Sequence, residues 1–310
     1  IRDRYKKYRF SRRKYEEIEE GLKKAAGSEY AQNYTTCFLQ DGDAFVLRTE
    51  FLIQILEGIH KYLPNIKHVT TYARADSIAR KSVSELRELK AAGIEHLYCG
   101  METGSDLILR KINKGFDAAT IIIGGTKAKE AGMVLSEFTL FGIGGKELAE
   151  ENAVETAKVL NVIKPDFIRV HATGIKLSSE MWNYVKNKEL TLQSEEEIVS
   201  EQKIMLELLA DDMDCIYMNE HIVNLLLEVR GNIRTDKQNM LETINTYLQL
   251  PKQEQELFNL GRRLNIMFFL ADLNNRAKRK QTEEGLRKIK AQNPDLDLAF
   301  VCNYVRQTQI

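Results

Sequence analysis

The sequence predicts an α/β protein in which parallel strands alternate with helices to form a sheet or a barrel. Five short apolar runs begin at about Thr35, His68, His96, Val134 and Phe167, at intervals of about 28 to 38 residues, and amphipathic helical patterns fill most of the gaps. A strand followed by a helix, repeated at this interval, is typical of right-handed βα units. Ligands bind at the carboxyl ends of the strands in such folds, so the small and polar residues that end each run are the candidates for function.

The individual elements follow from periodicity and from residues that begin or end helices. Ser82 stands three residues before Glu85, which is the spacing of a capping box, and Gly27, Gly93 and Gly132 suit positions just after helix ends. The predicted strands cover residues 34–39, 68–72, 94–101, 134–140 and 167–170. The predicted helices of this part cover residues 11–26, 49–62, 82–93, 117–130 and 146–162, with a short helix that begins at Ser105.

After about Lys176 the alternation stops and only helical patterns follow. Ser194 begins the first of them as a cap, and the predicted helices cover residues 194–209, 220–229, 237–248, 253–274 and 282–291. We therefore predict two domains, an α/β domain over residues 1–193 and an all-helical C-terminal region over residues 194–310. Within the last helices, seven basic residues between Arg276 and Lys290 fit a solvated helix face.

Composition limits the classes of partner. The chain has 310 residues, of which 43% are hydrophobic, and its 45 basic and 45 acidic residues give no net charge. This balance argues against nucleic acid or an anionic membrane as a general partner. No apolar run approaches the roughly 20 residues of a transmembrane helix, so a cytoplasmic location is expected. The four cysteines are far apart and form no CxxC pair, so these residues contain no metal-ligand signature.

Two of the strand ends carry carboxylates. Asp41-Gly42-Asp43 can present carboxylates and backbone groups to an ammonium group or a metal ion, and it also suits an ordinary βα turn. Glu102 and Thr103 follow an apolar strand directly, where a carboxylate can accept two hydroxyl hydrogen bonds, as from a ribose. A capping role for Thr103 or Ser105 is the alternative.

Other strand ends offer glycine, basic or hydroxyl groups. Gly142 begins a glycine-rich loop that could approach a flat or phosphorylated ligand, although it matches neither nucleotide-binding glycine motif. Arg74 is a candidate for a negatively charged substrate group, and Ser136 either faces a ligand or is a satisfied core hydroxyl. His171 suits a general acid or base, a stacking residue or a plain rim histidine. His221 is predicted to begin a helix outside the barrel, in a structural role.

Taken together, these strand ends resemble those of radical S-adenosylmethionine (radical SAM) enzymes, and most closely the coproporphyrinogen oxidase-like and elongator-like branch. Residues 38–43 resemble the strand-two element that holds the methionine amino group, and residues 98–104 resemble the strand-four element whose polar residues meet the ribose. Residues 140–147 resemble the strand-five glycine element near the adenine, and Arg169 and His171 fall on strand six. The resemblance implies a cofactor site that contains Asp41, Gly42, Asp43, Arg74, Glu102, Thr103, Ser136, Phe141, Gly142 and His171.

The resemblance also implies a fold and a reaction. The fold is a partial (βα)6 TIM-like barrel without its first strand and cluster loop, and the resemblance covers about Arg9 to Leu177. The reaction is reductive cleavage of S-adenosylmethionine at a [4Fe–4S] cluster to a 5′-deoxyadenosyl radical, which abstracts hydrogen from a small-molecule or modified substrate. An electron donor such as flavodoxin or ferredoxin is the expected partner.

The family's CxxxCxxC motif is absent from these residues. We expect its cysteines immediately upstream of Ile1, because residues 5–10 resemble the stretch that usually follows them. Without three thiolates the chain cannot hold the cluster and is expected to be inactive by itself. Two alternatives stay open: an ordinary βα-barrel lyase, for which Lys146 and Lys176 are the nearest lysines, and a cluster-less binding or scaffold protein.

Overall fold

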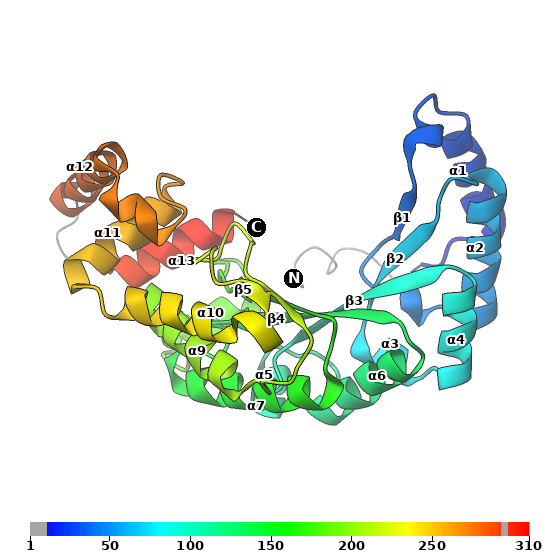
Figure 1. Cartoon of the computed structure of the whole chain (residues 1–310), viewed down its shortest axis with the longest axis horizontal. Coiled ribbons are helices and arrows are strands. Elements are labelled where there is room, and N and C mark those ends of the chain that lie inside the picture. Colours follow the sequence, from blue (N-terminus) through cyan, green and yellow to red (C-terminus); the bar gives the residue numbers. More distant parts are fainter. Residues whose placement is uncertain (1–10, 293–296, 310) are drawn as a thin grey trace. The chain divides into compact units, whose positions relative to one another are not determined.

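The computed structural model of the chain describes residues 11–292 and 297–309 (Figure 1). In this part of the chain, seven strands form one sheet in the order β1-β2-β3-β4-β5-β6-β7. Strands alternate with helices up to β5, so the predicted α/β class is confirmed, in the strand order of a partial TIM-like fold. Residues 5–10 and most of the basic N-terminal run lie outside the described residues.

The chain divides into two compact units. Of the described residues, unit 1 contains 11–101 and 118–137, and unit 2 contains 102–117, 138–292 and 297–309. The division falls before the last residue of β3 and in the middle of β4. The predicted domain boundary at residue 194 stays a prediction.

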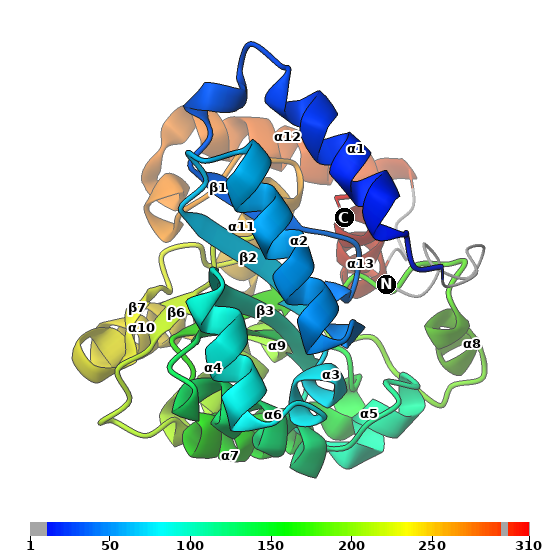
Figure 2. The same cartoon turned by 90° about the vertical axis from the view of Figure 1, so that its right-hand side faces the viewer.

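Unit 1 is built on parallel strands with helices on one face. The strands are β1 (Thr36–Leu39), β2 (His68–Ala73), β3 (Ile94–Glu102) and the first half of β4 (Val134–Phe141). The helical elements are α1 (Tyr15–Ala26), η2 (Ala31–Asn33), η3 (Ala44–Val46), α2 (Thr49–Tyr62), α3 (Ala75–Ala79), α4 (Val83–Ala91) and α6 (Ala118–Glu130). Helices α2 and α4 lie over one face of β1, β2 and β3 (Figure 2).

Alternation along the strands decides which side chains meet the helices. On β2, Val69, Thr71 and Ala73 are buried, whereas His68 and Tyr72 are exposed. Successive strand residues point to opposite faces, so the buried set lies under the helices and the other set lies on what we call the open face. Parallel pairing, with one register shift between Val69 and Thr70 on β2, places residues of neighbouring strands side by side on each face.

The predicted capping box of α4 is confirmed. The Glu85 N–H donates to Ser82 Oγ at 3.2 Å, and the Ser82 N–H donates to Glu85 Oε2 at 2.8 Å. These two bonds satisfy donors that a helix N-terminus would otherwise leave unpaired.

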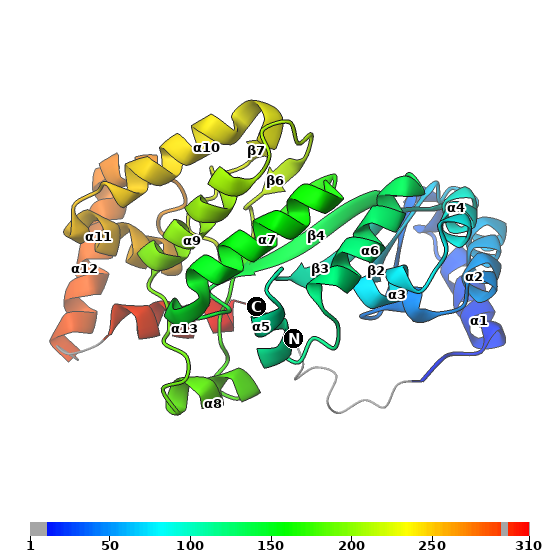
Figure 3. The same cartoon turned by 90° about the horizontal axis from the view of Figure 1, so that it is seen from below.

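Unit 2 combines the second half of β4 with three further strands and the remaining helices. The strands are β5 (Phe167–Ala172), β6 (Ile216–Met218), which pairs parallel to β5, and β7 (Gly231–Asn232), which pairs antiparallel to β6. The helical elements are α5 (Asp106–Lys111), η4 (Lys146–Leu148), α7 (Ala149–Ile163), α8 (Glu180–Lys186), α9 (Glu195–Leu208), α10 (Ile233–Leu248), α11 (Lys252–Arg263), η5 (Leu270–Asn274), α12 (Arg276–Gln292) and α13 (Leu298–Thr308). Helices α7, α9 and α10 pack side by side (Figure 3).

The prediction that only helices follow Ser194 is wrong in detail, because β6 and β7 lie in this region. Each is two or three residues long, too short to show an alternating pattern. The helix predicted over residues 220–229 is also absent: the segment is irregular, and its apolar residues Val223, Leu225 and Leu226 are buried. Their spacing fits an amphipathic helix and a buried loop equally well.

A buried ion cluster joins three helices of unit 2. Glu195 of α9 accepts hydrogen bonds from Arg263 Nε and Nη2 of α11, both at 2.8 Å, and from Arg306 Nη1 of α13 at 2.8 Å. These side chains are at most 2% exposed. Burial alone would raise the pKa of Glu195, but the two guanidinium groups outweigh it and hold that pKa at about 2.

Among the described residues, every helix is too short or too polar to span a membrane.

Candidate functional site

The loop after β1 separates the roles of its two carboxylates. Asp43 Oδ1 accepts the Arg74 N–H at 3.2 Å, and Oδ2 accepts the Ser77 hydroxyl at 2.5 Å. Asp43 therefore ties this loop to the N-terminus of α3, although burial raises the pKa of its carboxyl against these bonds. Asp41 is exposed and forms no hydrogen bond with the described residues, so its carboxylate is open to a ligand.

Gly42 allows the sharp bend between the two carboxylates. Its φ of +27° lies in a region that glycine adopts without the strain a side chain would bring. Gly42 and Asp41 are both exposed, so the tip of the loop presents a carboxylate next to accessible backbone.

Arg74 is brought to this end of unit 1, but its side chain is engaged. The Arg74 Nε donates to Asp76 Oδ1 at 3.0 Å, and Asp76 also accepts from Arg80 at 3.1 Å. The Arg74 side chain is 39% exposed, so an anionic ligand group would have to compete with Asp76.

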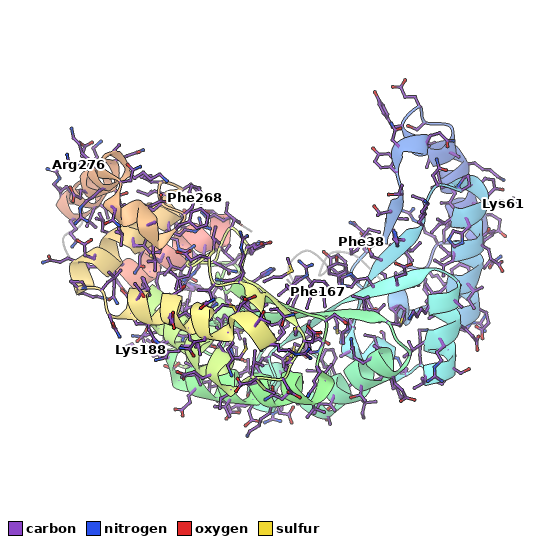
Figure 4. All side chains as sticks on the ribbon, viewed as in Figure 1. Phe38, Lys61, Phe167, Lys188, Phe268 and Arg276 are labelled. Atoms are coloured by element: carbon purple, nitrogen blue, oxygen red, sulfur yellow. The ribbon has the colours of Figure 1, made fainter. Side chains whose placement is uncertain are left out.

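Ser136 is fully buried, as the alternative of a satisfied core hydroxyl predicts, and it contacts an aromatic cluster of the open face that the sequence analysis missed. Ser136 Oγ and His96 Nε2 are 2.8 Å apart, and the His96 ring stacks on Tyr98 with centroids 4.3 Å apart. Phe38 contacts Tyr98 and Tyr72 at 5.5 and 4.7 Å, and it lies on the face of the strands opposite α2 (Figure 4). The alternation of these residues along β1, β2 and β3 was the available signal.

Glu102 ends β3 in an unusual backbone conformation. Its φ is +66°, in the left-handed region that non-glycine residues rarely adopt, and it is 7% exposed. Its Oε1 accepts from Lys114 Nζ at 2.8 Å, and its Oε2 forms no hydrogen bond with the described residues. A conformation of this kind costs about 1–3 kcal/mol, so the surrounding structure must hold it in place.

The residues after Glu102 supply that support. Ser105 caps α5, because its Oγ accepts the Ile108 N–H at 3.3 Å, so the alternative of a capping role is confirmed for Ser105. Thr103 Oγ1 accepts the Ser105 N–H at 2.9 Å and so holds the turn before the helix. A Cβ on Gly104 would lie 2.2 Å from the Glu155 carbonyl oxygen, so only glycine allows this approach to α7. The Gly104 N–H donates to Thr156 at 2.9 Å and fixes the same contact.

The glycine loop after β4 rests on a buried carboxyl group. Gly142 has φ +81°, and its N–H donates to Glu201 Oε2 at 3.0 Å. Glu201 also accepts from Asn152 at 2.5 Å and from Gln193 at 2.9 Å. Burial raises the pKa of Glu201 to about 7 against these three bonds. Glu201 stands 59 residues from Gly142, so no local pattern predicts the contact.

Phe141 contributes its backbone to this end of unit 2. Its side chain is 3% exposed, and its carbonyl oxygen accepts the Thr173 N–H at 2.8 Å. This bond joins the end of β4 to the chain just after β5.

His171 lies near the end of β5 and stacks on His221. The two ring centroids are 4.0 Å apart, and Phe138 of β4 meets His171 edge-on at 5.4 Å. The prediction that His221 begins a helix away from the site is therefore wrong. Burial first, and then His221 and Arg169, lower the pKa of His171 to about 4, so its imidazole is neutral at pH 7.

The cysteines do not form a cluster site. Cys37 and Cys99 belong to unit 1, Cys215 and Cys302 belong to unit 2, and none of the four forms a disulfide. Among the described residues, no group of three or more His, Cys, Asp or Glu side chains could hold a metal ion. The described residues therefore do not fit a [4Fe–4S] cluster, which needs three or four cysteine thiolates close together.

Comparisons with known proteins concern the fold alone. No family model matches the chain, and no curated protein matches it. The fold is similar to that of radical SAM enzymes. Coproporphyrinogen III oxidase from Escherichia coli, a radical SAM enzyme, has a TM-score of 0.49 and 15% identity, over 62% of this chain and 45% of that chain.

Two further structures are similar to a comparable degree. Elp3 from Methanocaldococcus infernus has a TM-score of 0.49 and 13% identity, over 69% of this chain and 53% of that chain. The radical S-adenosylmethionine methyltransferase TsrM from Kitasatospora setae has a TM-score of 0.46 and 12% identity, over 89% of this chain and 56% of that chain. The chain spans about half the length of these structures.

Proposed function

We propose that the chain binds S-adenosylmethionine at its strand ends and serves in radical SAM chemistry. The proposed reaction class is reductive cleavage of S-adenosylmethionine at a [4Fe–4S] cluster, with hydrogen abstraction from a substrate that is not identified. The described residues offer no ligand set for the cluster, so the roles below concern S-adenosylmethionine alone.

Glu102 is the observation that carries the proposal. Glu102 is a buried residue in a left-handed backbone conformation at the carboxyl end of a parallel strand. Strained conformations of this kind cluster at functional sites, and ligands of such folds bind at this end of the strands. Lys114 occupies Oε1, and Oε2 has no hydrogen-bond partner among the described residues. A ribose presents two neighbouring hydroxyl donors, which a carboxylate in this place can accept.

The other strand ends receive roles that match their chemistry. In unit 1, the exposed Asp41 suits the methionine ammonium group, with Gly42 and Asp43 shaping the loop. In unit 2, the backbone of Phe141 and Gly142 suits the edge of the adenine, with Glu201 holding the loop in place.

The remaining candidate residues take subsidiary roles in the proposal. Arg74 suits the methionine carboxylate, in exchange for its bond to Asp76. Ser136 and His171 suit polar contacts to the bound molecules. Thr103 holds the turn beside Glu102. We also propose flavodoxin or ferredoxin as the electron donor, and a cytoplasmic location.

The decisive test is binding of S-adenosylmethionine to the chain, measured by calorimetry with S-adenosylhomocysteine as a second ligand. We expect Glu102→Gln to weaken binding about 10- to 100-fold, because the charged acceptor is worth about 1.5–3 kcal/mol. Glu151→Gln is the matched control: Glu151 is exposed, accepts a bond from Ser105 in the same unit, and should leave the affinity unchanged. Equal affinities for Glu102→Gln and the unaltered chain would refute the role, and no binding at all would refute the proposal.

The reaction class needs a separate measurement. The complete gene product, reconstituted anaerobically with iron and sulfide, should form 5′-deoxyadenosine from S-adenosylmethionine when dithionite is added. A reconstituted protein that binds a cluster but forms no 5′-deoxyadenosine would contradict radical chemistry and leave binding alone.

A further inference from the structure

The loop over residues 219–230 is irregular but firmly held. The Asn224 side chain donates to the Val170 carbonyl at 2.7 Å and accepts the Ala172 N–H at 2.8 Å, so it pairs with β5 as a short strand would. Asn219 donates to the Leu226 carbonyl at 2.5 Å and closes the loop on itself. Irregular backbone of this kind needs such partners when it is buried.

Two arginines of α11 brace the same loop from behind. Arg262 donates to the carbonyl oxygens of Asn224 at 2.9 Å and Ile222 at 2.5 Å, and Arg263 donates to that of Val223 at 2.8 Å. Arg262 also lies over the ring of Phe268, which is labelled in Figure 4, at 5.3 Å. These contacts fix the backbone of the three residues that follow His221.

These hydrogen bonds hold the imidazole of His221 over that of His171. His221 and His171 are both partly exposed, and the Val223 N–H contacts His221 Nδ1 at 3.4 Å. Each ring brings a nitrogen donor and a nitrogen acceptor while neutral, and two donors when protonated.

The field around the pair is positive. Arg262 is fully buried, is hydrogen-bonded to carbonyl oxygens rather than to a carboxylate, and its Nη1 has no hydrogen-bond partner among the described residues. Burial and Arg262 lower the pKa of His221, as burial, His221 and Arg169 lower that of His171. Glu220, the neighbour of His221 in the sequence, is paired with Arg230. A positive field over two imidazoles is complementary to an anion.

We propose that His171 and His221 form a binding site for an oxyanion, the carboxylate or phosphate group of the substrate, with Arg262 behind it. The assignment of this group to the substrate rests on the proposed function; the site itself does not. An anion at this place would stabilise the protonated form of the pair, so binding takes up a proton.

The sign of the pH dependence follows from that linkage. The pKa of each ring lies below the ordinary 6.5, and an anion favours the charged form, so affinity should rise as pH falls from 7 toward the His171 pKa of about 4. The charged groups that act on the pair are Arg169 on β5 and Arg262 on α11, and β4 contributes the uncharged Phe138. Glu228, at the end of the loop, has a pKa raised by burial and bonds the Leu270 N–H at 2.7 Å.

The test is a titration of the ¹⁵N-labelled chain followed by the imidazole signals of its five histidines. Sodium acetate and inorganic phosphate are the two probes, with sodium chloride at matched ionic strength as the control. S-adenosylmethionine is left out, so the result does not depend on the proposed cofactor site. His60, His68 and His96 serve as internal references.

We expect the signals of His171 and His221 to shift together and to saturate with one probe, and the pKa of the pair to rise on binding. His221→Asn should weaken this binding about tenfold, because one charge-assisted hydrogen bond is lost. Response to acetate or to phosphate distinguishes a carboxylate from a phosphate substrate group. Shifts equal to those of the reference histidines, or equal to those in chloride, would overturn the proposal. If the variant does not fold, the unaltered chain alone still decides between these outcomes.

Discussion

Replacing Glu195 with Gln should destabilise unit 2 strongly. The substitution leaves Arg263 and Arg306 buried without a negative partner, and breaking a buried ion pair from one side costs about 3–5 kcal/mol. The pKa gives an independent figure: it falls from an ordinary 4.5 to about 2. Each pH unit between these values is worth about 1.4 kcal/mol, so the charge contributes about 3 kcal/mol at neutral pH.

The assay is urea unfolding of both proteins at pH values between 7 and 3. Because the pKa of Glu195 is lowered in the folded state, its contribution is complete above about pH 5 and is lost as pH falls toward 2. The difference between the two proteins should shrink over that range. Glu207→Gln is the matched control, since Glu207 is an exposed residue of the same helix and should change stability by less than about 0.5 kcal/mol. A loss below 1 kcal/mol for Glu195→Gln, or one that does not vary with pH, would refute the reasoning.

Three further outcomes follow from the described contacts. Gly104→Ala should cost more than about 2 kcal/mol in urea unfolding, because its Cβ would lie 2.2 Å from the Glu155 carbonyl oxygen. Gly21→Ala lies in a helix where nothing is within 4 Å of the new Cβ, so it should instead raise the free energy of unfolding by about 0.5–1 kcal/mol. A lower stability for Gly21→Ala would contradict the view that the contact with Glu155 is what makes Gly104→Ala costly. Burial raises the pKa of Glu201 to about 7, so this group lowers the free energy of unfolding as pH rises from 4.5 to 7. Glu201→Gln should therefore reduce the slope of unfolding free energy against pH in this range. An unchanged slope would show that the carboxyl is not protonated in the folded state.

The order of strands and longer helices up to β5 follows from the sequence because each of these elements carries its own signal, whereas the five-residue helix α3 was missed. The alternation on β2 and the Ser82–Glu85 capping box are local patterns, and the structure has both. Three-residue β6 and two-residue β7 carry no such signal, since their place is set by pairing with β5 and with each other.

The candidate site was predictable only in part, for a related reason. The strand ends were found from their position after apolar runs, which is how Asp41, Glu102 and His171 were identified. The contacts that hold the strand ends in place come from residues far away in the sequence. Glu201 accepts the Gly142 N–H across 59 residues, and no local pattern around His221 predicts its contact with His171 of β5. The apolar spacing of residues 220–229 fits a helix, and the contacts that hold this segment as a loop are made with distant residues, so the segment's own sequence does not reveal them.

The ion cluster of unit 2 also sets an order of events during synthesis of the chain. Glu195 and Arg306 are 111 residues apart, so the carboxylate leaves the ribosome long before its second guanidinium partner is made. At about 5 to 20 residues per second, that interval lasts roughly 5 to 20 s. Until then α9 carries a charge that it cannot bury with all of its partners, so unit 2 can complete its packing only after translation has passed Arg306.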